Sequence, residues 1–505
     1  MARINNHGDI LVVVLVFAAV AMTVLTGLAN WGVAMLKGIR TVATREQAFQ
    51  IAEAGIDYYR WHLAQLPTDY KDGTNLAGPY YHKFYDKDGN LIGSYALSIV
   101  PPPAGSTKVV ITSTATTTAN PTVKRIVQAT MAIPSLAQYS VVADDYLRFG
   151  AGTAVYGPVT SNYGIRFDGT AYNIISSAQN TYTDPDTGLT EWGVWTSIGS
   201  GDPQPPTAES ARPDVFTAGR QFPVPAFDFN GLTVNLQQLQ TAAQSGGKDW
   251  PPSGAQGYHM VMNPNGTYNM YKINSLQSVP SNCTNSNNQT QWGTWSIKVN
   301  NSGQITTGSG SSNSQTQVNG PNSDHSWPNP GNGILFIEDD LWIDGQISNT
   351  RLTIAAGTFP DSPGNEPNIT VGQDNGNATT GGNLLYTYFD GTDTIGLIAQ
   401  GNINVGLLSE DVLTVDAALV AENGRIGRFY YGANCTVNGT DYHVRSTINL
   451  NGMIATNQRY GFAYTDNTGY QIRNITYDSN LLYAPPPTFP LASSQYQMIS
   501  WDQVQ

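Results

Sequence analysis

The densest groups of carboxylates are the first candidates for chemistry in this sequence. They are Asp144-Asp145 and Glu338-Asp339-Asp340. Grouped acids on one face of a β-rich protein can bind Ca²⁺ or act as a general acid and a general base. Consecutive residues on a strand point to opposite faces, so a consecutive run makes a poor single site. We interpret these acids as solvated groups at turns and strand ends.

Two Asp-rich segments are similar to calcium loops in composition only. An EF-hand loop needs Gly at its sixth position and a bidentate acid at its twelfth. Counted from Asp86, these positions hold Leu91 and Leu97, and the segment that starts at Asp184 fails in the same way. We therefore predict no metal site, and we interpret residues 86–90 as a hairpin turn.

The remaining motifs give no catalytic constellation. The six histidines form no i, i+4 pair, and the chain has no nucleophile elbow, phosphate loop or dinucleotide fingerprint. We predict no catalytic residues, no cofactor and no enzymatic activity. The grouped acids keep one alternative open, which is a membrane-anchored polysaccharide lyase or hydrolase.

Tryptophans in loops rich in Gly and Asn are the candidate ligand contacts. A flat amphipathic ring can stack on a sugar or anchor a protein partner at low entropic cost. The candidates are Trp192, Trp195, Trp250 and Trp327. The alternative is that these rings fill the interior of the protein.

Composition narrows the class of protein. The net charge is −13 and there is no basic patch, which argues against a nucleic-acid partner. Only 12% of residues are charged, and Thr, Asn, Gly and Tyr replace them, as is typical of extended β-structure with many turns. Cys283 and Cys435 can form a disulfide if this region lies outside the cytoplasm, and the sequence leaves open whether they meet.

One helix must carry the N-terminal part of the chain. The run from Ile10 to Leu36 is uncharged and exceeds the roughly 20 residues that span a bilayer. Helical periodicity continues behind it to Leu66, where Pro67 ends the helix. A secretory signal has a shorter apolar region, so we predict a retained membrane-spanning helix over 1–66, with the remainder outside the cytoplasm.

Behind the helix the periodicity changes from helix to strand. Alternating segments at 91–100, 107–117 and 123–133 predict a small antiparallel sheet over 67–134. Short strands between Gly, Asn and Asp turns then recur through 135–505, with insertions over about 175–330 and a short helix at 231–246. We predict a mainly β protein whose head is a β-solenoid, and a β-sandwich is the alternative.

The N-terminal part resembles the PilX-type pilus assembly family and, more loosely, type IV pilin-like proteins and type II secretion pseudopilins. The matching features are a short polar leader that ends at Gly8, the apolar run, and an Arg-x-x-Ala-x-x-x-Ala-Glu-Ala-Gly segment. That segment comprises Arg45, Ala48, Ala52, Glu53, Ala54 and Gly55. The resemblance covers residues 1–66.

The resemblance implies a function and a location. A leader peptidase would cut between Gly8 and Asp9, and the chain would move from the inner membrane to a pilus at the cell surface. The fifth position after the cut holds Val13, where most pilins have Glu, which implies a minor subunit at a filament tip. The implied partners are other pilin-like subunits, the membrane, and a surface glycan or protein ligand. A stand-alone surface adhesin is the second alternative.

Overall fold

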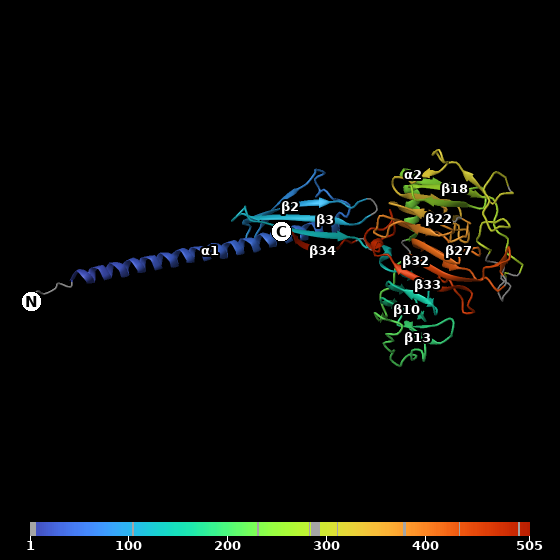
Figure 1. Cartoon of the computed structure of the whole chain (residues 1–505), viewed down its shortest axis with the longest axis horizontal. Helices are drawn as coiled ribbons and strands as arrows, with labels where there is room; N and C mark the ends of the chain where they lie inside the picture. The colour runs from blue at the N-terminus through green and yellow to red at the C-terminus, as the bar shows by residue number, and fades with distance from the viewer. Residues whose placement is uncertain are drawn as a thin grey trace, which may run out of the picture. The chain divides into compact units, whose positions relative to one another are not determined.

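The computed structural model describes residues 7–103, 106–229, 232–281, 283, 293–310, 312–376, 380–433, 435–492 and 495–504. It is mainly β, with one long N-terminal helix and a small antiparallel sheet (Figure 1). The chain divides into two compact units. The anchor unit comprises Met1–Pro102, Lys108–Ala132 and Gln495–Gln505, and the head unit comprises Pro103–Thr107 and Ile133–Ser494.

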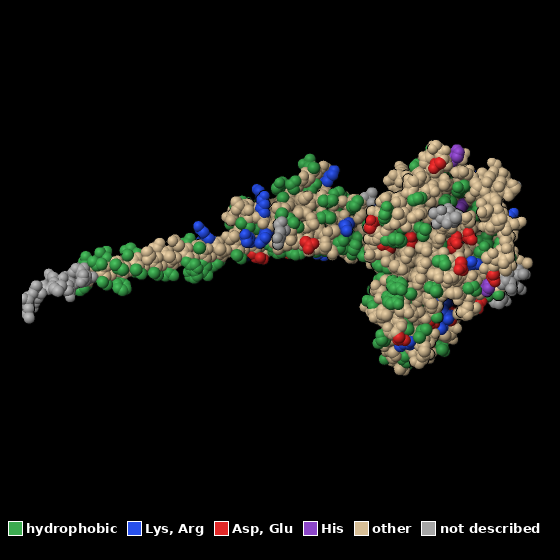
Figure 2. Space-filling view, viewed as in Figure 1, with side chains coloured by type: hydrophobic (Ala, Val, Ile, Leu, Met, Phe, Trp, Pro, Cys, Tyr) green, Lys and Arg blue, Asp and Glu red, His purple; other side chains and the backbone are tan. Residues whose placement is uncertain are grey.

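Helix α1 (His7–Gln65) has an exposed apolar half. Ile10 and Phe17 are 63% and 71% exposed, and Figure 2 shows apolar side chains along this half. The hydroxyls of Thr23 and Thr26 donate to helix carbonyls three or four residues earlier, so both polar groups are satisfied within the helix. By length and composition, α1 can cross a membrane.

The second half of α1 packs on an antiparallel sheet. The sheet contains β1 (Tyr80–Tyr85), β2 (Leu91–Val100), β3 (Val109–Thr117) and β4 (Lys124–Ala132). The buried helix residues recur at three- and four-residue steps, and they are Ala48, Ile51, Ala52, Ile56, Tyr59 and Leu63. The predicted strands of this sheet are confirmed to within about two residues.

The last strand of the chain belongs to the anchor unit. Strand β34 (Gln497–Val504) pairs antiparallel with β4, from Gln497 opposite Ala132 to Val504 opposite Ile126. The sheet order is therefore β1-β2-β3-β4-β34. This differs from the expected division, which places all of 135–505 in the head. The head unit is instead an insertion between two neighbouring strands, a pairing that no local pattern could indicate.

In the head unit, one ladder of parallel strands runs through most of the fold. Its members, in order of pairing, are β16 (Lys248–Trp250), β21 (Ile334–Ile337), β23 (Arg351–Ala356), β26 (Thr394–Ala399), β28 (Val412–Ala421), β32 (Val444–Thr456), β5 (Val141–Ala143), β8 (Val159–Ser161), β11 (Ile175–Ser177) and β15 (Arg220–Gln221). Thus β5, early in the head sequence, pairs with the late strand β32, so the chain enters this ladder in its middle.

Further parallel ladders accompany the first. One joins β17 (Tyr258–Asn263), β22 (Leu341–Ile347) and β25 (Leu384–Tyr386) to β28 and β32, and continues through β33 (Gly469–Tyr477), β7 (Thr153–Val155) and β10 (Thr170–Ala171). Another joins β22 to β24 (Ile369–Val371), β27 (Ile403–Val405) and β29 (Ile426–Arg428), and a third contains β6 (Leu147–Phe149), β9 (Ile165–Phe167) and β14 (Val194–Trp195).

Antiparallel elements decorate these ladders. They are the hairpins β12 (Thr181–Thr183) with β13 (Thr190–Trp192) and β30 (Thr436–Val437) with β31 (Thr440–Asp441), and β18 (Thr267–Ile273), which pairs with β17, β19 (Gln315–Val318) and β20 (Trp327–Pro328). Helix α2 (Leu232–Gly246) lies against β21 and β16, and its Leu236, Leu239 and Ala243 belong to a buried cluster with Ile334 and Phe336 of β21. Short 3₁₀ turns occur at Leu136–Gln138 and Ser479–Leu482.

The main core of the head lies between the ladders. It consists of inward-facing Val, Ile, Leu and Phe side chains from successive strands, such as Ile354, Leu397 and Leu419. Because each strand contributes only a few of these residues, the core exists only when the strands are stacked.

Candidate ligand groove of the head

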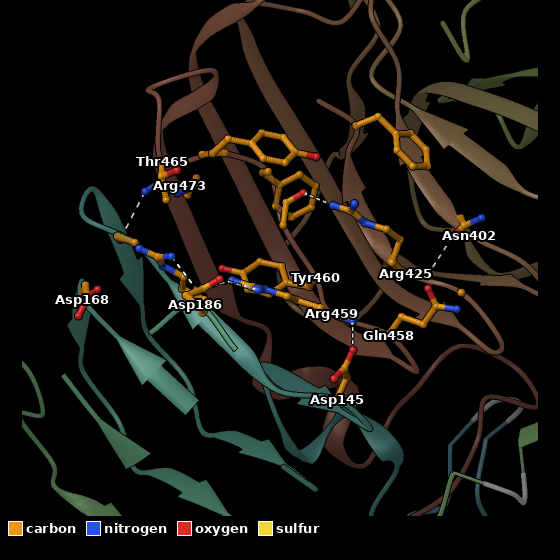
Figure 3. A pocket seen from close by; sticks show the side chains of 18 of the residues that line it. Asp145, Asp168, Asp186, Asn402, Arg425, Gln458, Arg459, Tyr460, Thr465 and Arg473 are labelled. Carbon is orange, nitrogen blue, oxygen red and sulfur yellow. Dashed lines mark hydrogen bonds and ion pairs between the residues drawn. The ribbon is translucent and has the colours of Figure 1, made fainter. Parts of the chain in front are cut away.

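The head unit contains a groove of about 1240 Å³. One side is formed by segments within 145–198 and the other by segments within 364–473 (Figure 3). Residues of both sides end or connect strands of the ladders, which places short polar and charged side chains along the opening. The lining includes four arginines, which are Arg148, Arg425, Arg459 and Arg473.

Two of these arginines share one carboxylate. Arg148 Nη1 lies 2.7 Å from Asp186 Oδ2, and Arg459 Nη2 lies 3.0 Å from the same oxygen. Burial alone would raise the pKa of Asp186, but the hydrogen bonds and charges of Arg459 and Arg148 outweigh it and hold the pKa below its usual value. Asp186 is therefore ionised at neutral pH and shares its negative charge between two guanidinium groups.

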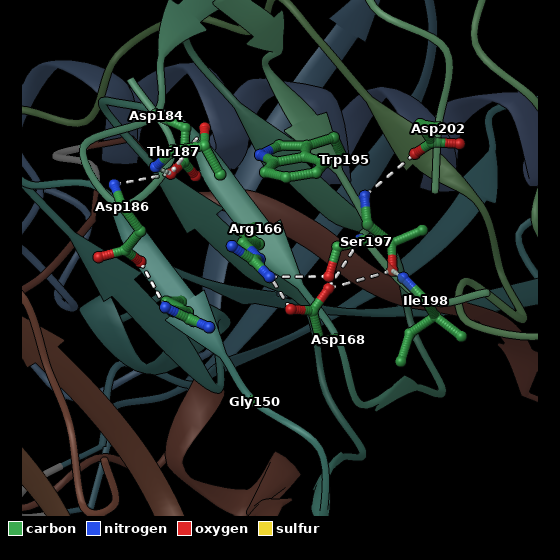
Figure 4. A network of polar contacts seen from close by, with 12 residues as sticks. Gly150, Arg166, Asp168, Asp184, Asp186, Thr187, Trp195, Ser197, Ile198 and Asp202 are labelled. Atoms are coloured by element: carbon green, nitrogen blue, oxygen red, sulfur yellow. Dashed lines mark hydrogen bonds and ion pairs between the residues drawn. The ribbon is translucent and has the colours of Figure 1, made fainter. Parts of the chain in front are cut away.

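The hairpin β12–β13 presents Asp186 to the groove. Asp184 is buried at the start of the turn, and its Oδ1 accepts hydrogen bonds from the backbone N–H groups of Asp186 (2.8 Å) and Thr187 (3.0 Å) (Figure 4). Tyr182 donates to the other oxygen of Asp184, and Trp195 Nε1 donates to the Tyr182 hydroxyl. The turn is thus held by a buried acid and two aromatic residues.

A second acid in the groove is fully engaged. Asp168 Oδ2 lies 2.7 Å from Arg166 Nε, and its Oδ1 accepts from the backbone N–H of Ser197 at 2.8 Å. The guanidinium of Arg166 also lies over the ring of Trp195, 5.0 Å from its centroid. These contacts tie the ends of β9 and β14 together and leave Asp168 poorly placed for proton transfer.

Arg425 differs from the other groove cations. Its Nη2 donates to the carbonyls of Gly461 (3.1 Å) and Arg428 (3.4 Å), and its guanidinium lies 5.3 Å from the centroid of the Phe429 ring. Within the described part of the chain it forms no ion pair with a carboxylate. The exposed amides of Asn423 and Gln458 lie along the same side.

Two of the four candidate tryptophans lack the exposure that a ligand contact needs. Trp195 and Trp250 are each 5% exposed and contribute to the interior. Trp192 and Trp327 are half-buried, and their indole N–H groups donate to the carbonyls of Pro203 and Val318. Lys248 Nζ lies 4.8 Å from the Trp250 ring and 4.9 Å from the Trp327 ring. A ligand role for Trp192 and Trp327 stays a prediction.

The grouped acids are dispersed over different structural contacts. Asp339 accepts from the backbone of Ser253, Asp340 from that of Asn368, and Glu338 from the side chain of Gln240. Burial, which dominates over the hydrogen bonds of Asn368, raises the pKa of Asp340. Among the described residues no group of three His, Cys, Asp or Glu side chains is arranged to hold a metal ion.

The two cysteines are joined. Cys283 and Cys435 form a disulfide that links segments 152 residues apart. Both are buried in a small cluster with Leu407, Phe429 and Tyr431. The disulfide therefore fastens the region that follows β18 to the neighbourhood of the groove, where Phe429 lies.

The segment that resembles the pilin-like families forms the contact between α1 and the anchor sheet. Ala48 and Ala52 are fully buried, and a Cβ atom at Gly55 would lie 2.3 Å from Ser113 Oγ and 2.9 Å from Tyr95 Cδ2. Small residues are therefore required where the helix crosses β2 and β3. Arg45 is exposed, and Glu53 and Ala54 are half-buried. Gly8 and Asp9 lie in the first turn of α1.

Sequence reasoning missed the groove. Its charged centre joins Asp186 to Arg459, which are 273 positions apart in the sequence, and no motif marks either residue. The TDPDTG turn that carries Asp186 is the one available signal, and its composition points to a calcium loop instead of an arginine partner.

No protein-family model matches the chain. No curated protein matches it. Among solved structures, it is similar to the competence-associated pilin ComZ from Thermus thermophilus, with 14% sequence identity and a TM-score of 0.30 over 91% of this chain and 98% of that one. At that score the two structures do not establish a shared fold.

Proposed function

We propose that this protein is a membrane-anchored, pilin-like filament subunit that displays a β-rich ligand-binding head. The observation that carries the proposal is the division of α1. Its first half is apolar and exposed, and it continues without a break into a half that packs on an antiparallel sheet. Such a helix can lie in a bilayer and can pack among like helices in a filament, because both surroundings cover apolar side chains.

The proposal includes finer assignments that the N-terminal residues suggest. They are a PilX-type relationship, cleavage between Gly8 and Asp9, storage in the inner membrane, and a minor position that caps the filament or mediates adhesion. The close contact of Ala48, Ala52 and Gly55 with the anchor sheet gives a structural reason why this segment, which resembles the pilin-like families, has small residues. The partners would be pilin-like subunits through α1 and a surface ligand through the head.

The head is best described as a β-solenoid with decorations. Parallel ladders support this description, because the sheets of a β-sandwich are antiparallel. A stacked architecture offers long grooves across successive strand ends, which suits adhesion. We assign no catalytic step, since the groove acids Asp168 and Asp186 are engaged by arginines and Asp145 and Glu366 accept hydrogen bonds from backbone N–H groups.

Immunogold labelling of surface fibres with antibody against the head tests the proposal. We expect gold on fibres or at their ends, and gold confined to the cell body would contradict a filament role.

A variant of α1 tests the role of its apolar half. Leu25→Arg places a charge in this exposed half and should remove the protein from membranes and fibres, because the charge costs about 3 kcal/mol on membrane insertion. Ala64→Arg, at an exposed position near the other end of α1, is the matched control.

Mass spectrometry of the mature N-terminus tests the processing step separately. A chain that begins at Asp9 would support cleavage after Gly8, and a chain that begins at Met1 would show that the leader is not cleaved. The filament proposal would then depend on the immunogold result alone.

A further inference from the structure

We propose that the head groove binds a carboxylate-bearing polysaccharide, and that Asp186 occupies the position of a ligand carboxylate until the ligand displaces it. The inference deepens the proposed function, on which it rests only for the placement of the head outside the cell. It names acidic polysaccharides as the ligand class of the groove and Asp186 as the group that competes with the ligand.

The first support is the geometry around Asp186. Arg148 and Arg459 converge on one carboxylate that is supplied from outside the ladders by the β12–β13 hairpin. Guanidinium groups bind carboxylates through paired donors, so the site suits the same group on a ligand. Because the hairpin forms its own two-stranded sheet, Asp186 can leave the arginines without breaking a ladder.

The second support is the charge that the lining would carry once Asp186 is displaced. Two guanidinium groups share its single negative charge, and Arg425 on the same groove has backbone carbonyls as its hydrogen-bond partners. The lining holds four arginines and four carboxylates (Asp145, Asp168, Asp186 and Glu366), so displacement of Asp186 from the arginines would leave one positive charge in excess. Such a groove would select an anionic ligand.

The third support is the character of the lining. The volume of about 1240 Å³ exceeds the roughly 300–1,000 Å³ of small-molecule sites, which favours an extended ligand. The exposed amides of Asn423, Gln458 and Asn467 can pair with hydroxyl groups. The lining therefore suits an extended ligand rich in hydroxyl groups, such as a polysaccharide.

The experiment measures binding of the full-length chain in detergent to oligogalacturonate. The same oligosaccharide with its carboxylates methyl-esterified is the matched ligand, because only its charge differs. We expect binding of the acidic form and at least tenfold weaker binding of the ester. Equal affinity for the two forms would overturn the carboxylate requirement.

Three variants test the roles of the groove residues. Asp186→Asn should tighten binding about tenfold, because it removes the competitor without removing an arginine. Arg459→Gln and Arg425→Gln should each weaken binding about tenfold. Lys298→Gln changes an exposed head cation outside the groove and should leave affinity unchanged. Weaker or unaltered binding by Asp186→Asn would overturn the displacement mechanism. If Arg459→Gln fails to fold, Asp186→Asn and Arg425→Gln still test the proposal.

Poly-glutamate distinguishes recognition of a sugar from recognition of charge. Equal binding of poly-glutamate and oligogalacturonate would show that the groove reads charge alone, which would overturn the saccharide assignment. Gold on fibres without oligogalacturonate binding would refute this inference and leave the proposed function standing. Binding without gold on fibres would refute the filament role and leave the groove assignment standing.

Discussion

The anchor unit and the head unit reach stability by opposite routes. In the anchor sheet, strands β1 to β4 are close in sequence, as where Val100 pairs with Val110, and β34 is the exception. In the head, the chain returns over long distances, as where Ile454 pairs with Val141. Local contacts cost less loop-closure entropy than distant ones. The anchor packs its helix closely on a local sheet at Gly55, whereas the head adds a disulfide and buried ionic contacts between distant segments to its stacked apolar core.

The largest expected effect breaks the covalent link of the head. Replacement of Cys283 and Cys435 by serine opens a connection across 152 residues. We expect a loss of about 5 kcal/mol in the free energy of unfolding of the head, because the open chain gains conformational entropy. Urea denaturation followed by pulse proteolysis and mass spectrometry should show earlier unfolding of head peptides. An equal shift in anchor peptides would contradict the separation of the two units.

The next effect concerns a buried ionic link within the head. His259 Nε2 lies 2.8 Å from Asp344 Oδ2, and His259 Nδ1 lies 2.7 Å from Gln315 Oε1. Burial alone would lower the pKa of His259, but the charge of Asp344 and the hydrogen bonds of Asp344 and Gln315 outweigh it and raise the pKa. Gln315 Nε2 donates to Thr307, so its oxygen is the atom that faces the imidazolium.

A raised histidine pKa gives stability at low pH. The contribution is complete below the unfolded-state pKa of about 6.5 and disappears as pH rises through the higher folded-state pKa. At pH 5, His259→Gln should cost the head about 4 kcal/mol, because Asp344 loses its buried partner. Urea midpoints from pH 5 to 9 should converge for wild type and variant as pH rises. Parallel profiles would show that the pair does not titrate in this range.

A smaller effect tests the close packing of the anchor. Gly55→Leu would push a side chain against Ser113 and Tyr95, and we expect a loss of about 2 kcal/mol in anchor stability. Gly38→Leu is the matched control, since a Cβ at that position of the same helix would meet no atom within 4 Å other than its own neighbouring helix backbone. Hydrogen exchange of β2 and β3 measures the difference. Similar protection in both variants would mean that the helix tolerates a wider separation from the sheet.

The smallest effect concerns a contact between side-chain hydroxyls that joins distant parts of the anchor unit. The hydroxyl of Tyr496 lies 3.0 Å from that of Tyr70 and donates to the carbonyl of Pro67. Tyr496→Phe should cost about 1 kcal/mol, seen as faster hydrogen exchange in β34. Tyr81→Phe, at a side chain that is 77% exposed, should leave exchange unchanged. If both variants exchange alike, the hydroxyl pair does not fasten the last strand.

The contrast between the units also explains what could be predicted from the sequence. Helix α1 and strands β2 to β4 can be predicted from the spacing of apolar residues along the chain, and the end of α1 from Pro67, because neighbouring residues define each of these elements. The pairing of β34 with β4 and of Asp186 with Arg459 joins residues hundreds of positions apart, and no periodicity carries that information. Trp195 stands out in the sequence as a candidate ligand contact, but its ring supports the hairpin that carries Asp186 instead of meeting solvent.

The return of β34 to the anchor sheet sets the order in which a nascent chain can mature. The ribosome makes Lys124–Ala132 before the whole head and Gln497–Val504 after it. Until translation has passed the head, one edge of β4 stays open in the anchor sheet. A truncated polypeptide would thus carry helix α1 on an unfinished sheet, a difference that a protease could use to recognise incomplete chains.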